Sequence, residues 1–375
     1  MHSRYSSIHN SGHGKHPRLP KKIRVPVKPA LSITVLVDDT TVDASDPQFI
    51  HSNPEGKTEY AVIRALRALG YPVYVLPVDD SVDPIVKQLH ENPPGLIFNL
   101  TETFRSQRKF DRNIAALLEL MQIPFTGTGS AGLMLCRDKS LSKNLLRAND
   151  IPVPAFFTID PGKPLIIPGC LSFPLVVKPL YEDGSDGISN GSFVKSEEEL
   201  RERVAMIHEH FREPAIAEEY IEGRELYIGL VGNSNVRMLP VRELHFGATE
   251  GGPVLATFKV KWDREYQKKW NISFGFGQID ESIEKQLDQI CCRAYHVLQM
   301  VDYGRIDVRL TNDNKIYVLE ANPNPGIGPD DEIAKAARKT GIPYEDLIQE
   351  LLDLALDRNG RAKKSLKVTR SANAC

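Results

Sequence analysis

The sequence is poor in cysteine, has no long apolar run and has no excess of charge of one sign. Its five cysteines include no CxxC pair, which argues against a disulfide framework and a zinc site and fits a reducing cytosol. No apolar run approaches the roughly 18 residues that a membrane span requires. The formal net charge of −2 lacks the basic excess that is typical of nucleic-acid-binding proteins. We therefore expect a cytoplasmic protein that binds neither membranes nor nucleic acids.

The length and composition of the chain suit a globular protein with several domains. At 375 residues, 41% hydrophobic and 26% charged, it is long enough for two or three domains with ample core. Residues 1–29 are basic and no acid precedes Asp38, so we interpret them as a disordered tail. A metal-binding arm, through the histidines of this segment, and an organelle transit peptide stay open. Residues 357–375 form a second polar tail.

Alternating strand and helix patterns divide the rest of the chain into three regions, 30–130, 131–222 and 223–356. In the first region strands and helices alternate, which predicts a parallel sheet with helices on its faces. The third region begins with the segments 226–231, 238–244 and 257–260. The expected strands of the first two regions are 33–37, 73–77, 96–100, 175–179, 191–194 and 215–220. The expected helices are 59–69, 83–91, 114–121, 138–149, 197–211, 283–300, 332–338 and 344–356.

A predicted hairpin near the C-terminus carries a set of oxygen ligands. The runs 304–310 and 316–326 have strand patterns, and the turn-forming residues Asn312 to Asn314 lie between them. Residues two apart on a strand share a face, so Asp307, Glu320 and Asn322 can point the same way. Two carboxylates and an amide oxygen suit Mg²⁺, or Mn²⁺, that takes its remaining ligands from water and phosphates. The alternative is a surface hairpin with scattered acids.

This hairpin resembles the metal-binding hairpin of the ATP-grasp carboxylate–amine ligases, and most closely that of the D-alanine–D-alanine ligases. The resemblance extends from about Leu31 to Leu356 and implies α/β and α+β structure in a three-domain ATP-grasp architecture. Its parts are a parallel-sheet N-terminal domain, a small lid domain and a large central domain. Further matching segments in the same order are Asp138 to Lys143, Phe173 to Pro179, Gly184 to Ile188 and Glu218 to Leu226.

The resemblance implies an ATP- and Mg²⁺-dependent ligase that forms an acyl phosphate and then an amide bond. Lys139 and Lys178 would contact the nucleotide, while Lys143, one turn further on, fits a surface charge. Lys261 would lie on a mobile loop and contact the γ-phosphate. The remaining implied roles are phosphate contact by Gly184 and Ser185, adenine binding by Glu218 and Ile221, ribose binding by Glu225, and catalysis by Arg305 and the backbone of Gly326. Arg309 fits a role on this face or at the surface.

The chain departs from the ligase pattern where substrates would bind. The family's histidine-containing, glycine-rich segment is replaced by residues 98–111, and its serine–leucine pair after Gly326 by residues 327–332, whose three acids would repel a carboxylate. Asp38 or Asp39 could substitute for an absent N-terminal glutamate. If 105–112 is helical, its basic residues share a face. That face is either solvated or recognises a substrate with extra carboxylates; the residues are Arg105, Arg108, Lys109 and Arg112.

These features leave several functional hypotheses, of which an amide-forming ligase for small-molecule amino acids or peptides is favoured. A ligase for a pair other than two D-alanines is one alternative. A nucleotide-binding regulatory protein without turnover is another, and the three intact metal ligands argue against it. A homodimer is compatible with the resemblance.

Overall fold

The computed structural model describes residues 31–38, 57–182, 184–247 and 255–372. The chain divides at residue 30, and everything below concerns the part from Leu31 onward. The predicted tail 1–29 and Asp39 therefore lie outside the described residues. Within the described ranges, none of the helices has the length and apolar content that a bilayer crossing requires.

The first region forms the predicted parallel sheet, with strand order β2-β1-β3. Its central strand is apolar and almost entirely buried, as expected for a strand covered by helices on both faces. The glycine after the first helix, Gly70, has a φ of 86°, which lets the chain leave the helix in a left-handed conformation. The elements are β1 (Ile33–Asp38), α1 (Thr58–Ala68), β2 (Val73–Val78), α2 (Asp83–Glu91), β3 (Leu96–Asn99) and α3 (Asp111–Leu120).

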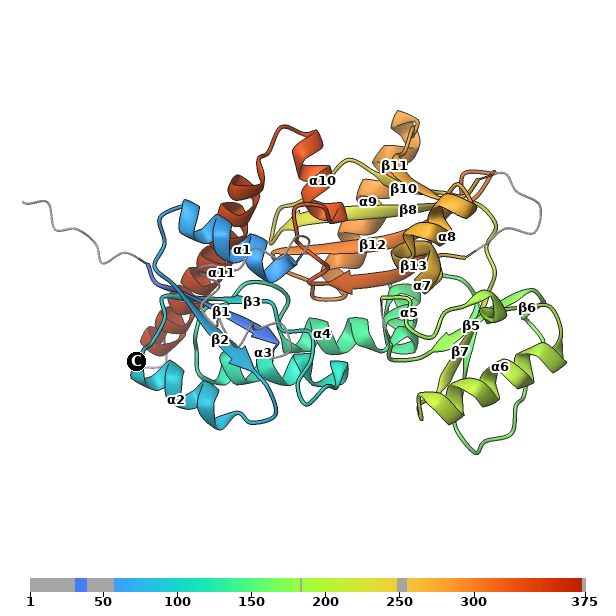
Figure 1. The fold of residues 1–375 in the computed structure, drawn as a ribbon, viewed down its shortest axis with the longest axis horizontal. Helices are drawn as coiled ribbons and strands as arrows, with labels where there is room; N and C mark the ends of the chain where they lie inside the picture. The colour runs from blue at the N-terminus through green and yellow to red at the C-terminus, as the bar shows by residue number, and fades with distance from the viewer. Residues whose placement is uncertain (1–30, 39–56, 183, 248–254, 373–375) are drawn as a thin grey trace, which may run out of the picture. The chain divides into compact units, whose positions relative to one another are not determined.

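The second region is a small antiparallel sheet of order β4-β7-β5-β6, covered on one face by α6 (Figure 1). The side chain of Asp138 caps α5 by accepting hydrogen bonds from the backbone of Ser140 and Leu141. Ser196 caps α6 in the same way, and three glutamates occupy the first turn of that helix. The elements are α4 (Ser130–Arg137), α5 (Lys139–Ala148), β4 (Phe156–Ile159), β5 (Leu175–Pro179), β6 (Phe193–Val194), α6 (Glu197–His210) and β7 (Ala215–Glu219).

The third region contains a larger antiparallel sheet of order β11-β10-β8-β12-β13, with β9 paired to β8. Helix α9 covers one face of this sheet (Figure 1), and the core between them is built from apolar residues of α9, β8, β12 and β13. The opposite face carries the candidate site. The elements are β8 (Arg224–Gly232), β9 (Val236–Met238), β10 (Arg242–His245), β11 (Ser273–Phe276), α9 (Glu281–Val297), β12 (Tyr303–Leu310) and β13 (Ile316–Pro323).

The predicted C-terminal hairpin is confirmed as β12 and β13, and it contains a β-bulge. Asp307 pairs with Glu320, but the next residue, Val308, pairs with Val318, so Leu319 has no partner in the ladder. The bulge separates two faces: Val318 faces the buried core with α9, while Glu320 faces the candidate site. The turn closes with Asn314 at a φ of 62°.

The remaining helices differ in part from the sequence expectations. Residues 257–260 belong to the start of a short helix, because the Thr257 hydroxyl accepts a hydrogen bond from the Val260 backbone. The last helix, expected to end at 356, continues to Ala372. The short helices α7 (Phe258–Trp262) and α8 (Arg264–Lys269) precede β11, and α10 (Glu332–Lys339) and α11 (Tyr344–Ala372) pack with α1 in one apolar core.

Candidate active site

Two adjoining cavities of about 660 and 80 Å³ lie on the face of the large sheet opposite α9. Lys261 and Glu320 line both cavities, so the two cavities adjoin at these side chains. Every residue to which the sequence analysis gave a catalytic, nucleotide-binding or metal-binding role lines one of the two cavities, whereas Asp38 and most of the basic segment 105–112 do not. The larger is lined by Lys139, Gly184, Lys261, Arg305, Glu320, Asn322 and Gly326, and the smaller by Lys178, Ser185, Glu218, Ile221, Glu225 and Asp307.

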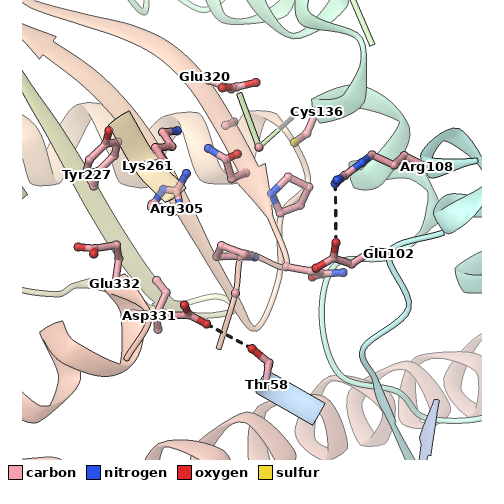
Figure 2. A pocket seen from close by; sticks show the side chains of 18 of the residues that line it. Thr58, Glu102, Arg108, Cys136, Tyr227, Lys261, Arg305, Glu320, Asp331 and Glu332 are labelled. Carbon is pink, nitrogen blue, oxygen red and sulfur yellow. Dashed lines mark hydrogen bonds and ion pairs between the residues drawn. The ribbon is translucent and has the colours of Figure 1, made fainter. Parts of the chain in front are cut away.

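Glu320 is the carboxylate on which the positive charges of the site converge. Its Oε1 lies 3.4 Å from Nζ of Lys139, which also donates to the backbone oxygen of Glu182. Burial raises the pKa of Glu320, but four cations outweigh burial and lower it to about 2. These cations are Lys139, Lys178, Lys261 and Arg305. The carboxylate is therefore ionised at neutral pH, and it lies at the same cavity as Lys261 and Arg305 (Figure 2).

Arg305 and Asp307, two residues apart on β12, form a bidentate ion pair. Nε of Arg305 lies 2.6 Å from Oδ1 of Asp307, and Nη2 lies 3.0 Å from Oδ2. Burial raises the pKa of Asp307, and the guanidinium opposes that rise. The nearby amide of Asn322 is a buried polar group whose Nδ2 has no hydrogen-bond partner. Asn322 lies directly opposite Arg305 in the hairpin, and Glu320 opposite Asp307.

Asp307, Glu320 and Asn322 carry hard oxygen ligands of the kind that Mg²⁺ takes, on two paired strands. Among the described residues, no group of three or more His, Cys, Asp and Glu side chains could hold a metal alone. Two carboxylates and one amide on paired strands are therefore an incomplete set of hard ligands, which phosphate oxygens and water would complete. Both oxygens of Asp307 accept one hydrogen bond each from Arg305, and each keeps a further lone pair that is available to a metal.

Lys143 is not the surface charge that the sequence analysis expected. Its side chain is buried, donates a 2.7 Å hydrogen bond to the backbone oxygen of Leu319, and lies 3.4 Å from Glu218. Lys178 lies 3.2 Å from the same Glu218 oxygen. Burial, together with the charge of Lys178, lowers the pKa of Lys143 to about 8, against the opposing effect of Glu218. Two lysines therefore share one carboxylate beneath the smaller cavity.

Glu225 is held through both carboxylate oxygens. Nη2 of Arg309 lies 2.9 Å from Oε2, and the hydroxyl of Tyr227 donates to Oε1 at 2.9 Å. Arg309 is buried on the site face, so the surface alternative for it was wrong. The sequence analysis missed Tyr227, although its position two residues after Glu225 on a strand indicated that the two side chains share a face.

The glycine-rich loop of the second region is tied to the third region. The Ser185 hydroxyl donates a 2.8 Å hydrogen bond to the backbone oxygen of Ala256, just before α7. Ser185 has a φ of 69°, within a tight turn. The neighbouring Asp186 pairs with Arg108 at 3.2 Å, so its negative charge is partly neutralised. The loop is therefore bound to the third region by the Ser185 hydrogen bond and to the first region by the ion pair of Asp186 with Arg108.

The basic segment 105–112 does not form the single helical face that its spacing suggested. Arg105 has a φ of 53° and its Nε donates to the backbone oxygen of Asp80, away from a helical path. Residues Arg108–Phe110 form a short 3₁₀ turn before α3. Arg108 lines the larger cavity and lies 3.7 Å from Glu102 (Figure 2). The other three cations of the segment do not line this cavity, so the structure does not support recognition of extra carboxylates by all four.

Of the three acids after Gly326, Glu332 is paired with a cation and Asp331 is held by neutral donors. Asp331 accepts hydrogen bonds from the backbone of Gly328 at 2.7 Å and the hydroxyl of Thr58 at 3.4 Å (Figure 2). Glu332 lies 2.6 Å from Arg242. A Cβ on Gly326 would lie 2.7 Å from the Asp331 carboxylate, so the chain passes this point closely.

The acid proposed to replace an N-terminal glutamate has a structural role. Asp38 accepts hydrogen bonds from the backbone and the hydroxyl of Thr103, which brace the segment after β3. It is not among the described residues that line the two cavities. The suggestion that Asp38 binds a substrate ammonium therefore has no support.

Comparison with known proteins places the chain in a family. A model described as D-ala D-ala ligase C-terminus matches residues 145–353. An uncharacterized protein, y4sG, of Sinorhizobium fredii is 31% identical over 80% of this chain and 88% of its own length. The D-alanine–D-alanine ligase of Carboxydothermus hydrogenoformans is 30% identical over 82% of this chain and 94% of its own.

A solved structure shows that the fold is shared. The Bacillus anthracis D-alanine–D-alanine ligase, complexed with ATP, superposes with a TM-score of 0.70 at 19% identity, covering 89% of this chain and 100% of that one. The predicted ATP-grasp architecture is thus confirmed. With the family match over more than half of the chain, these findings show that the protein belongs to the D-alanine–D-alanine ligase family of ATP-dependent carbon–nitrogen ligases.

Proposed function

We propose that this ATP-dependent ligase activates the carboxylate of an amino acid or short peptide, joins it to an amine, and uses a pair other than two D-alanines. The observation that carries the reaction type is that three cations, Lys139, Lys261 and Arg305, line one cavity together with Glu320, which lies 3.4 Å from Lys139. A carboxylate and the γ-phosphate of ATP repel each other, so a site that brings them together needs such fixed positive charges.

The residues of the smaller cavity suit the nucleotide. Lys178, which lies 3.2 Å from Glu218, would contact phosphate, as would Lys139 in the larger cavity. Glu225 is placed to accept the ribose hydroxyls, since a carboxylate offers several lone pairs beyond those used by Arg309 and Tyr227. Glu218 and the backbone near Ile221 would hold the adenine.

The residues of the larger cavity suit the reacting groups. Lys261 on α7 and Arg305 on β12 face the space beside Glu320, where they would stabilise negative charge that develops on the transferred phosphoryl and carboxylate oxygens. Gly326 would offer its backbone N–H. Magnesium, when bound by Asp307, Glu320 and Asn322, would neutralise phosphate charge. The hydrogen bond from Ser185 to Ala256 joins the two segments that border the phosphate end, which supports exclusion of water.

The larger cavity also supports the change of substrate. Where the ligases for two D-alanines have their histidine-containing segment, this chain places the ion pair of Glu102 and Arg108 against the cavity. Where those ligases have a serine–leucine pair, this chain has Asp331, which accepts a hydrogen bond from Thr58 of α1. A site that hydrogen-bonds particular substrate groups rejects analogues that leave its polar groups unpaired, so these exchanges favour another substrate.

The test is phosphate release from ATP with Mg²⁺ over a panel of D- and L-amino acids and dipeptides, singly and in pairs, with product masses measured. We expect one pair to support turnover far above D-alanine alone. Turnover with D-alanine alone at the rate of the best pair would overturn the substrate proposal. ATP binding without phosphate release for any pair would indicate a regulatory nucleotide-binding protein instead.

A matched pair of lysine variants links turnover to this site. Lys178→Met removes a buried cation, and we expect it to lower kcat/KM for ATP by roughly 100-fold, as for loss of one electrostatic contact to a transition state. Lys285→Met removes an exposed lysine that pairs with Glu281 one turn away on α9, and should leave turnover unchanged. Equal activity of both variants would place the reaction elsewhere.

A further inference from the structure

Tyr227 is a buried aromatic residue on the site face that none of the functions above uses. It lies on β8 two residues after Glu225 and directly opposite Asp307 on β12. Its side chain is 3% exposed and lines the larger cavity. Figure 2 shows it beside Lys261 and Arg305, at the same wall of the cavity.

The hydroxyl of Tyr227 fixes the carboxylate of Glu225. It donates a 2.9 Å hydrogen bond to Oε1, while Arg309 holds Oε2 at the same distance. Burial, followed by the charge of Glu225, raises the pKa of the phenol well above its usual value, so the hydroxyl keeps its proton and stays a donor. With both oxygens held, the carboxylate has one orientation before any ligand binds.

The ring of Tyr227 is a platform for two cations. Nζ of Lys261 lies 5.6 Å and Cζ of Arg305 lies 5.2 Å from the ring centroid, within the range of cation–π attraction. Phe274 on β11 stacks on the ring, with centroids 6.1 Å apart and planes inclined by 26°. The ring therefore contacts Phe274 together with a lysine of α7 and an arginine of β12 that lie 44 residues apart in the sequence.

We propose that Tyr227 is a positioning residue that joins the two ends of the nucleotide site. Through its hydroxyl it orients Glu225 toward the ribose hydroxyls, and through its ring it holds Lys261 and Arg305 toward the γ-phosphate. The inference rests on the proposed function, because it takes the roles of Glu225 and Lys261 from there. It makes separate predictions for the two parts of one side chain.

The hydroxyl is tested with Tyr227→Phe and calorimetric titration by ATP and by 2′,3′-dideoxy-ATP, both with Mg²⁺. Loss of one hydrogen bond to a carboxylate should weaken ATP binding roughly fivefold to tenfold. The dideoxy nucleotide lacks the hydroxyls that Glu225 would bind, so its affinity should be the same for the variant and the wild type. An equal loss for both nucleotides, or no loss for ATP, overturns the role of the hydroxyl.

The ring is tested with Tyr227→Leu and titration by ATP and ADP. Removal of the platform should reduce the preference for ATP over ADP by about tenfold, since only ATP carries the γ-phosphate that Lys261 would contact. Tyr227→Phe keeps the ring and should keep the wild-type ATP-to-ADP preference. A Tyr227→Phe variant that loses this preference, or a folded Tyr227→Leu variant that retains it, overturns the role of the ring.

A second tyrosine separates positioning from stability. Tyr295 is fully buried behind the sheet, and its hydroxyl donates at 3.0 Å to the backbone oxygen of Gly232. Tyr295→Phe therefore also removes a buried tyrosine hydrogen bond, and it should lower stability without changing nucleotide affinity. The same affinity loss in both phenylalanine variants would make the effect structural and overturn the inference. Failure of the wild type to bind ATP would instead reject the proposed function.

Discussion

Replacement of the buried Asp302 by asparagine should change how stability depends on pH. Asp302 is fully buried just before β12. Its Oδ2 accepts a 2.8 Å hydrogen bond from the backbone of Gly127 and lies 3.3 Å from Arg358 of α11, whereas Oδ1 has no hydrogen-bond partner. Burial raises the pKa of Asp302 from 3.8 to about 6, and the charge of Arg358 limits the rise.

The sign of the effect follows from the direction of this shift. Between pH 4 and 6 the folded protein keeps a proton on Asp302 that the unfolded chain has released, so wild-type stability falls as pH rises. Two pKa units, at 1.36 kcal/mol each, correspond to roughly 3 kcal/mol across this window. The asparagine amide of the variant cannot ionise. The stability of Asp302→Asn relative to wild type should therefore increase by about that amount between pH 4 and 7.

Urea unfolding at several pH values between 4 and 7, followed by fluorescence and circular dichroism together, measures this difference. The change with pH is the informative quantity, because an asparagine amide in the place of Oδ1 adds a cost that does not depend on pH. Asp353→Asn, at an exposed position of α11, makes the same change in charge and serves as the control. A relative stability of Asp302→Asn that stays constant, or that falls as pH rises, would refute the reasoning.

Two further substitutions test contacts that border the site. Lys143→Met removes the hydrogen bond to Leu319 and one of the two cations on Glu218, so urea unfolding at pH 7 should show a loss of about 2 kcal/mol; a change within about 0.5 kcal/mol would support a surface role instead. Ser185→Ala removes the hydrogen bond to Ala256, so calorimetry should show ATP binding weakened about fivefold. Unchanged ATP affinity of Ser185→Ala would mean that this link does not order the loop.

The sequence was a good guide wherever a side chain's direction follows from local periodicity. The alternation of strands and helices predicted the parallel sheet, and the period of two placed Glu320 and Asn322 on one face of the hairpin. The same rule, applied to β8, would have found Tyr227. Lys139 and Lys143 share a helix face by their spacing of four, so the same reasoning would have placed Lys143 near Lys139 and not at the surface.

The features that escaped prediction depend on contacts between distant segments. Nothing in helix α5 indicates that its lysine face packs on β13 and β7, which is why Lys143 was assigned to the surface. The helical spacing of the basic segment is interrupted by the left-handed backbone of Arg105, which has no local signature in a non-glycine residue. The pairing of Asp331 with Thr58 joins residues 273 positions apart, beyond any pattern in a window of sequence.

The bulge at Leu319 fixes the register of β13 against β12. Leu319, which has no partner in the ladder, accepts a hydrogen bond from Lys143 of α5 through its carbonyl oxygen. The bulge is therefore stabilised by a residue outside the hairpin. Deletion of Leu319 would remove the bulge and restore regular strand pairing. Either Glu320 would then turn toward the apolar core, or Val318 would turn toward the larger cavity. Shortening the chain by this one residue should therefore be far more damaging than any exchange of its side chain.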